Sequence, residues 1–195
     1  MDYTKRVEIL VEEPSMEAFL RGLLPRLLPT PYALDQNCFI RPHRGKSDLQ
    51  RSLINKTKAM RGGFGIADLR LVVLHDQDAN DCIRLKAKLA KIIEDNNAGL
   101  PYLIRIACKE LENYYLGDFA ALERTYPENR LASRATKAKY RRPYRLNGAE
   151  ELGRLVPDFT KIDGGRRLGP VISLTDNRST SFNQLIRGLQ RFLAT

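Results

Sequence analysis

Hydrophobic positions in residues 5–125 switch repeatedly between a strand-like and a helix-like spacing. Strand-like runs cover residues 6–12, 38–40, 69–74 and 102–107, and helix-like runs cover 14–25, 47–54 and 82–93, with a short helix at 119–122. Strands that alternate with helices indicate βαβ units and a mainly parallel sheet. The 69–74 run is almost continuously apolar, which favours a strand covered on both faces.

The pattern changes after residue 125, where basic residues gather. Residues 134–145 contain no Asp or Glu but include Arg134, Lys137, Lys139, Arg141, Arg142 and Arg145, interleaved with Tyr140 and Tyr144. A short helix at 149–155, a glycine-rich turn at Gly164 and Gly165, and a last helix at 181–193 are predicted. We expect one domain over residues 1–195, with a core at about 5–125 and a basic C-terminal extension at about 126–195.

Composition narrows the class of protein. The 195 residues include 33 Lys+Arg and 23 Asp+Glu, a net charge of +10, and 43% are hydrophobic. This content allows a globular core, and the positive charge suggests a polyanionic partner or simply a soluble basic protein. No apolar run approaches the roughly 20 residues that cross a bilayer, and the first residues lack a signal-peptide core, so we expect no membrane association and a cytoplasmic location.

The three cysteines predict no special chemistry. Cys38, Cys82 and Cys108 are odd in number, widely spaced and not part of a CxxC pair. That pattern argues against a zinc ribbon or a disulfide framework. We expect all three to be small buried apolar residues.

Acidic residues follow two of the predicted strands. Glu12 ends the first strand and Asp76 and Asp78 follow the third, while Glu17 lies one turn into the first helix. If these strands are neighbours, four carboxylates meet at the carboxyl edge of the sheet, where each pair at about 4 Å repels by roughly 4 kcal/mol. Mg²⁺ or Mn²⁺ would relieve that repulsion. The same residues also fit solvated strand ends, with Asp78 or Asp81 capping the next helix.

The order of Glu12 and then Asp76-x-Asp78 resembles the Toprim domain of topoisomerases, bacterial primases and nucleases of the overcoming-lysogenization-defect (OLD) type. Five ordered segments between residues 11 and 182 together resemble family 4276 of domains of unknown function, a Toprim-like family: VEEPSMEAFLRGLLPRLLP, HRGKSDL, VVLHDQDANDC, ELENYYLGD and NRSTSF. The resemblance implies a Toprim-like (Rossmann-like) α/β fold, with a central mainly parallel sheet flanked by helices.

The resemblance also implies a two-metal nuclease-type site, with Glu12, Glu17, Asp76 and Asp78 at the matching positions. Glu13 departs from the pattern, because Toprim motifs usually have Gly directly after the first Glu, and Met16 stands where many carry an acid. Glycine permits a tight turn and close approach of a phosphate, whereas Glu13 adds bulk and charge.

Phosphodiester hydrolysis is the reaction that this resemblance implies, with Asp76 and Asp78 in the catalytic site and Glu12 as general base or proton relay. Lys161 would stabilise charge on the transferring phosphate, as a lysine does in OLD-type nucleases. Glu112 either joins the metal pocket or only neighbours a core formed by Tyr114 and Tyr115.

Basic residues supply the expected contacts to nucleic acid. The HRGKS segment imitates the end of a phosphate-binding P-loop, but Ile40 stands where the full motif requires Gly, so we expect no nucleotide-binding loop of that kind. The residues expected to bind nucleic acid, unless they only form solvated loops, are Arg44, Lys46, Lys137, Lys139, Arg141, Arg142 and Arg178.

The leading hypothesis is a metal-dependent Toprim-like endonuclease in prokaryotic defence against phage or mobile elements. OLD-type nucleases work with an ATPase, so the resemblance also implies a separate ATPase subunit as partner. The alternative is a nucleic-acid-binding or regulatory subunit with a weakened Toprim site, of which Glu13 is the sign. A phosphohydrolase of small nucleotides is a third hypothesis.

Overall fold

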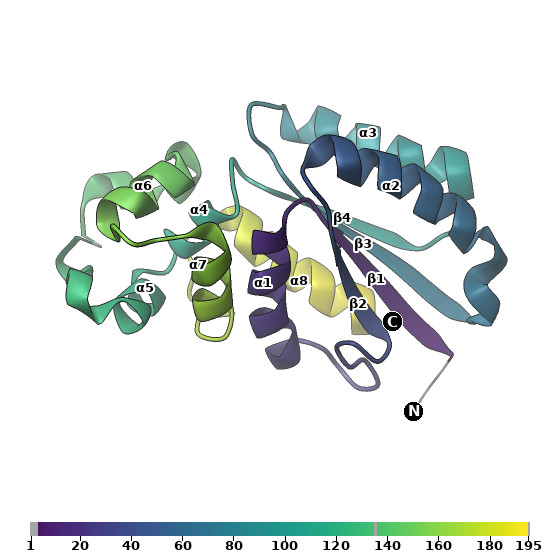
Figure 1. Cartoon of the computed structure of the whole chain (residues 1–195), viewed down its shortest axis with the longest axis horizontal. Helices are drawn as coiled ribbons and strands as arrows, with labels where there is room; N and C mark the ends of the chain where they lie inside the picture. The colour runs from purple at the N-terminus through teal and green to yellow at the C-terminus, as the bar shows by residue number, and fades with distance from the viewer. Residues whose placement is uncertain (1–3, 135, 195) are drawn as a thin grey trace.

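The computed structural model describes residues 4–134 and 136–194 (Figure 1). Four strands are present in this part of the chain: β1 (Lys5–Val11), β2 (Cys38–Pro42), β3 (Asp68–Asp76) and β4 (Tyr102–Ala107). The helices are α1 (Pro14–Leu23), α2 (Lys46–Ala59), α3 (Cys82–Asn97), α4 (Glu112–Tyr115), α5 (Phe119–Thr125), α6 (Gly148–Leu155), α7 (Lys161–Leu168) and α8 (Thr180–Ala194). Short 3₁₀ helices occupy Leu24–Arg26, Met60–Gly65, Pro127–Asn129, Ala132–Arg134, Ala138–Arg141 and Pro143–Arg145.

The strands form one parallel sheet in the order β2-β1-β3-β4. Val11 lies opposite Leu74 in the pairing of β1 with β3, so the carboxyl ends of these two strands are adjacent. The predicted α/β class with a parallel sheet flanked by helices is confirmed, and the arrangement is consistent with a Rossmann-like fold.

Helices cover both faces of the sheet. Figure 1 shows α2 and α3 side by side on one face and α1 with α8 on the other, while α4 to α7 extend beyond the carboxyl ends of the strands. The alternation along β1 explains the two layers, because Ile9 and Val11 pack with α1 and α8 whereas Leu10 packs with α2 and α3. The two central strands, β1 and β3, are therefore buried on both faces, as the apolar run of β3 predicts.

Local signals in the sequence explain where the helices begin. Pro14 stands in the first turn of α1, and Asp81 caps α3 by accepting a hydrogen bond from the Arg84 backbone N–H at 2.8 Å. Neither Ser47 nor Asp48 is the cap of the second helix: α2 begins at Lys46 after Gly45, whose φ of 95° suits glycine.

The core extends beyond residue 125, where the sequence pattern places its boundary. Leu168 of α7 and Phe182 and Leu185 of α8 share one apolar cluster with Ile9 and Val72 of the sheet. The segment after residue 125 is therefore part of the same core and not an appended extension. Residues 1–3, 135 and 195 lie outside the described residues.

The cysteines agree only in part with the prediction. Cys38 is buried, but Cys82 and Cys108 are half-buried, and all three are free thiols. Burial raises the pKa of the Cys38 thiol to about 12, so this residue behaves as a small apolar side chain.

Gly164 and Gly165 do not form the predicted turn. Both lie inside α7, which packs closely along α1. A Cβ on Gly165 would lie 2.7 Å from the Ser15 carbonyl oxygen, so only glycine allows the two helix backbones to approach this far. The close contact between helices outweighs the low helix propensity of glycine.

Gly165→Ala is expected to lower the free energy of unfolding by about 1–3 kcal/mol, because the added methyl group meets backbone that cannot turn away. Urea denaturation measures the change. Gly153→Ala in α6 is the matched control, since nothing lies within 4 Å of its added Cβ, and it should stabilise by roughly 0.5–1 kcal/mol. Equal effects of the two substitutions would contradict the close packing of α7 on α1.

Candidate functional site

Glu12 and Asp76 meet at the carboxyl ends of β1 and β3. Glu12 follows Val11 directly, and its Oε2 accepts a hydrogen bond from the Asp76 backbone N–H at 3.0 Å. Both residues are about 5% exposed. The neighbouring positions of β1 and β3 thus bring together the two acidic strand ends that the sequence singles out.

His75 lies beneath Glu12 on the α2/α3 face of the sheet and is fully buried. Its Nδ1 is 2.7 Å from Glu12 Oε2 and 2.6 Å from the Asp76 carbonyl oxygen. Both neighbours are acceptors, so Nδ1 carries a proton and donates to them. Burial lowers the pKa of His75, but the hydrogen bond and charge of Glu12 outweigh it and raise this pKa overall.

Glu12 is held in its ionised form. Burial raises the pKa of the Glu12 carboxyl, but the hydrogen bond and charge of His75 and the Asp76 backbone N–H lower it further than burial raises it. The charge of Lys46 acts in the same direction. Glu12 is therefore a fixed negative charge at the end of β1.

Asp76 and Glu112 form the deeper part of the site. Glu112, at the start of α4, is 1% exposed. Neither of its carboxyl oxygens has a hydrogen-bond partner, and the same holds for Oδ1 of Asp76. Burial, followed by the charges of Glu112 and Glu12, raises the pKa of Asp76 far above its usual range, and burial is also the main cause that raises the pKa of Glu112.

Lys161 is the cation that faces this acidic pair. It is the first residue of α7, and its Nζ lies 3.9 Å from Glu112 Oε1 and 3.6 Å from Glu13 Oε2. Burial lowers the pKa of Lys161, but the charges of Glu112, Glu13 and Asp76 raise it overall. An ammonium group at this point lowers the repulsion among the carboxylates.

The donor set fits a hard divalent cation in part. Asp76 and Glu112 have buried carboxyl oxygens without a hydrogen-bond partner. Carboxyl oxygens are the ligands that Mg²⁺ and Mn²⁺ prefer. Over residues 4–134 and 136–194, however, no group of three or more His, Cys, Asp or Glu side chains is arranged to hold a metal ion. Glu12 is directed to His75 rather than to the Asp76–Glu112 pair.

A family model described as Domain of unknown function (DUF4276) matches residues 11–190, which include Glu12, Asp76, Glu112 and Lys161. The chain belongs to the DUF4276 family. No curated protein and no solved structure matches it. The family assignment thus confirms the sequence resemblance, and the likeness to Toprim domains stays a prediction.

Two residues predicted for the metal site lie apart from the acidic pair in this DUF4276 protein. Glu17 accepts a hydrogen bond from Arg21 at 3.0 Å on the exposed side of α1, and Arg21 also binds Asp35. Asp78, with a φ of 51°, pairs with Lys46 at 3.7 Å and is partly exposed. Of the two residues predicted to cap the next helix, Asp78 and Asp81, the structure confirms Asp81 as the cap of α3.

The basic segment 134–145 is fastened beside the acidic site. Asn113, which follows Glu112 in α4, donates from Nδ2 to the carbonyl oxygens of Pro143 at 2.7 Å and Leu146 at 3.0 Å. Lys109, just after β4, donates to the Arg145 carbonyl oxygen at 3.2 Å. These contacts place the end of the segment next to the start of α4.

The basic residues of this segment are all exposed, but they differ in their partners. Lys137, Arg141 and Arg142 are exposed, as are Arg44, Lys46 and Arg178 elsewhere in the chain. Lys139 is paired with Glu151 at 2.5 Å. Tyr140 is not placed to stack on bases, because its ring is buried against that of Phe119, with 4.6 Å between the centroids.

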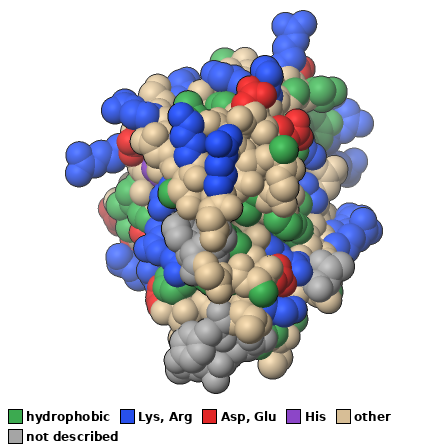
Figure 2. Space-filling model, turned by 90° about the vertical axis from the view of Figure 1, so that its right-hand side faces the viewer, with side chains coloured by type: hydrophobic (Ala, Val, Ile, Leu, Met, Phe, Trp, Pro, Cys, Tyr) green, Lys and Arg blue, Asp and Glu red, His purple; other side chains and the backbone are tan. Residues whose placement is uncertain are grey.

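Positive charge is not restricted to this segment. Figure 2 shows the side of the molecule on the right of Figure 1, and Lys and Arg side chains also project from its margins among scattered Asp and Glu.

In the described chain, no helix is long and apolar enough to cross a membrane.

Sequence reasoning missed two partners in the site. His75 precedes Asp76 in a strand, so the alternation of side chains places the two on opposite faces of the sheet. Because Val11 pairs with Leu74, the residues that follow them, Glu12 and His75, lie close together. The sequence marks Glu13 as a departure from the Toprim pattern and as the sign of a weakened site, and the structure pairs it with Lys161. The second contact joins α7 to the residue before α1, and no local pattern predicts it.

The raised pKa values make the stability of the protein depend on pH. Asp76 and Glu112 bind protons more strongly in the folded than in the unfolded chain, so their contribution is full at low pH and is lost as pH rises through the folded pKa. Asp76→Asn mimics the protonated acid. The free energy of unfolding of this variant, relative to wild type, should therefore increase from about pH 4 to pH 8 in urea denaturation series.

Glu12→Gln is the matched comparison, because the pKa of Glu12 is lowered and its contribution is present at neutral pH and lost as pH falls. This variant should be less stable than wild type near pH 7, with a smaller difference at low pH. If Asp76→Asn followed the Glu12→Gln trend, the desolvated state of Asp76 would be refuted.

Proposed function

We propose that this DUF4276 protein hydrolyses phosphodiester bonds of nucleic acid with the help of Mg²⁺ or Mn²⁺. The observation that carries the proposal is the set of buried carboxyl oxygens without a hydrogen-bond partner on Asp76 and Glu112, next to Lys161 at the carboxyl edge of a parallel sheet. Unsatisfied buried acids cost free energy, and such groups are typical of sites that bind a cation or a substrate.

Asp76 and Glu112 would hold the cation, which when bound offsets their repulsion and polarises the phosphoryl group as a Lewis acid. The chain itself supplies the other parts. Lys161 can bind a non-bridging phosphate oxygen, because its ammonium group is half-exposed beside Glu112. Burial of Asp76 and Glu112 excludes water around the carboxylates and strengthens every charge interaction there.

Glu12 serves to orient the site rather than as a strong base. Its pKa is lowered, so it takes up a proton poorly at neutral pH. It holds His75 through Nδ1 and the Asp76 backbone through its N–H, and so fixes the end of β3. The exposed Arg141 and Arg142 would guide the nucleic-acid backbone toward α4.

A second candidate is the nucleic-acid-binding or regulatory subunit with a weakened site. The observation in its favour is Lys161, whose ammonium already supplies positive charge between Glu13 and Glu112. A binding subunit would keep salt-dependent affinity for nucleic acid without binding metal. Metal titration in the absence of nucleic acid therefore separates the two candidates.

Nicking of supercoiled plasmid with Mn²⁺, Mg²⁺ or EDTA tests the hydrolase. We expect metal-dependent nicking that falls at least about 100-fold in Asp76→Asn and in Glu112→Gln, because each substitution removes an anionic ligand. Asp95→Asn is the matched control: Asp95 pairs with Lys91 on the exposed face of α3, near the opposite edge of the sheet.

A wild-type chain that binds neither Mn²⁺ nor Mg²⁺ by calorimetry would overturn the hydrolase and leave the binding subunit. A chain that binds metal but does not nick DNA is to be assayed again with RNA and with the ATPase subunit that the OLD-type resemblance implies. Defence against phage or mobile elements is tested by plating phage on cells that express wild type or Asp76→Asn.

The double variant Arg141→Gln/Arg142→Gln tests the basic segment. Binding of a fluorescent oligonucleotide should weaken, and the slope of log affinity against log salt should decrease by roughly 1–2, because up to two phosphate contacts are lost. Lys58→Gln/Lys91→Gln on the far parts of α2 and α3 removes the same charge. If both double variants weakened binding equally, net charge rather than this segment would account for it.

A further inference from the structure

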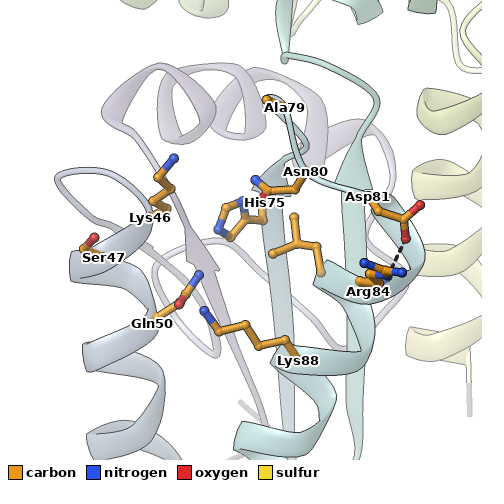
Figure 3. A pocket seen from close by; sticks show the side chains of 10 residues that line it. Lys46, Ser47, Gln50, His75, Ala79, Asn80, Asp81, Arg84 and Lys88 are labelled. Atoms are coloured by element: carbon orange, nitrogen blue, oxygen red, sulfur yellow. Dashed lines mark hydrogen bonds between the residues drawn. The ribbon is translucent and has the colours of Figure 1, made fainter.

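A pocket lies between α2 and α3, on the face of the sheet where His75 contacts Glu12. It has a volume of about 540 Å³, within the usual range for small-molecule sites. Figure 3 shows side chains from three elements around it: Lys46, Ser47 and Gln50 from α2, Ala79 to Asp81 from the connecting loop, and Arg84 and Lys88 from α3. Leu85 adds an apolar wall.

His75 marks the inner end of this pocket. Its Nδ1 is occupied by Glu12 and the Asp76 carbonyl, but its Nε2 is buried and has no hydrogen-bond partner. Figure 3 shows the ring extending from β3 into the space between Lys46, Gln50 and Lys88. A buried ring nitrogen needs a polar partner whether or not it carries a proton. With a proton, Nε2 donates to an oxyanion, and without one it accepts from a hydroxyl group.

The charges around the pocket favour an anion. Lys46, Arg84 and Lys88 are exposed cations, while Asp81 is the acidic residue in the lining. The Asp81 carboxylate accepts from the Arg84 backbone N–H, so it is engaged as the cap of α3. Asp78, just outside the lining, lies 3.7 Å from Lys46 and offsets part of its charge.

The start of α2 adds to this preference. Gly45 precedes it and offers no capping side chain, so the first backbone N–H groups of the helix have no side-chain acceptor from this cap. Lys46 and Ser47, the first residues of α2, line the pocket directly. The positive end of the helix dipole therefore points to the same space as the three cations.

We propose that this pocket binds the phosphate group of a nucleotide, as a site separate from the Asp76–Glu112 pair. Arg84 and Lys88 bind the phosphate oxygens together with the start of α2, and His75 Nε2 contacts the phosphate or a nucleotide hydroxyl. The rest of the lining includes the polar Gln50 and Asn80 and the apolar Leu85, which would contact the nucleoside. The ligand is either a free nucleotide or the 5′-phosphorylated end of a nucleic-acid strand.

This proposal does not depend on hydrolysis, because binding is measured in EDTA. The chain contains two histidines, His43 and His75. His43 lies outside the pocket, with its Nδ1 2.9 Å from the Val11 carbonyl oxygen, and serves as an internal control. Long-range ¹H–¹⁵N spectra of the labelled protein report each imidazole separately.

Adenosine 5′-monophosphate is the first probe, and adenosine is its control. We expect the monophosphate to shift the Nε2 signal of His75 in a saturable manner, with little change at His43. Arg84→Gln and Lys88→Gln should each weaken binding about tenfold or more. Lys86→Gln, on the same helix but outside this pocket, removes the same charge and should change the affinity less than about twofold.

The two sources of the phosphate are separated with oligonucleotides that carry a 5′-phosphate or a 5′-hydroxyl. Tighter binding of the phosphorylated strand than of the monophosphate assigns the pocket to strand ends, and the reverse assigns it to free nucleotides. The proposal is overturned if His75 does not respond up to about 10 mM monophosphate, if adenosine shifts it equally, or if Lys86→Gln weakens binding as much as Lys88→Gln.

Discussion

The parallel pairing of β1 with β3 places Glu12 against the backbone of Asp76 and the ring of His75. Because successive residues of a strand face opposite sides of the sheet, His75 and Asp76 open onto different surfaces from a single strand end. Glu12 lies between these two surfaces and accepts hydrogen bonds from the His75 ring and from the Asp76 backbone. The acidic pair and the basic pocket therefore rest on one shared contact, and changes at Glu12 affect both surfaces.

Buried acids of like charge require a compensating group, and α7 provides it through close helix packing. Gly165 faces the Ser15 carbonyl oxygen, and Gly169 approaches that of Phe19, so the two helices lie with their backbones almost in contact. That approach brings Lys161 to Glu13 and Glu112. The electrostatics of the site therefore depends on small residues about one and two helical turns away from Lys161.

The sequence predicts the strands because they follow from local patterns, and it predicts the meeting of Glu12 with Asp76 only on the condition that the first and third strands are neighbours, which the structure supplies. The apolar run at 69–74 and the acidic strand ends need only the alternation of a strand and the rule that parallel strands end at one edge. The roles of Glu112 and Lys161 depend on how α4 and α7 fold back, which no short-range pattern encodes. Gly165 misleads for the same reason, since its small size serves a contact with α1, which is distant in the sequence.

Glu12 is bound by the peptide N–H of residue 76 and not by its side chain. Every amino acid except proline supplies that backbone donor. The hydrogen bond between Glu12 and β3 therefore tolerates almost any residue at position 76. During evolution the acidic group can therefore be lost while the fold and the pocket beside His75 persist. The proposed catalytic role of Asp76 and the architecture of the sheet are therefore separable at this position, and a related protein without the acid would keep the same fold and the same pocket.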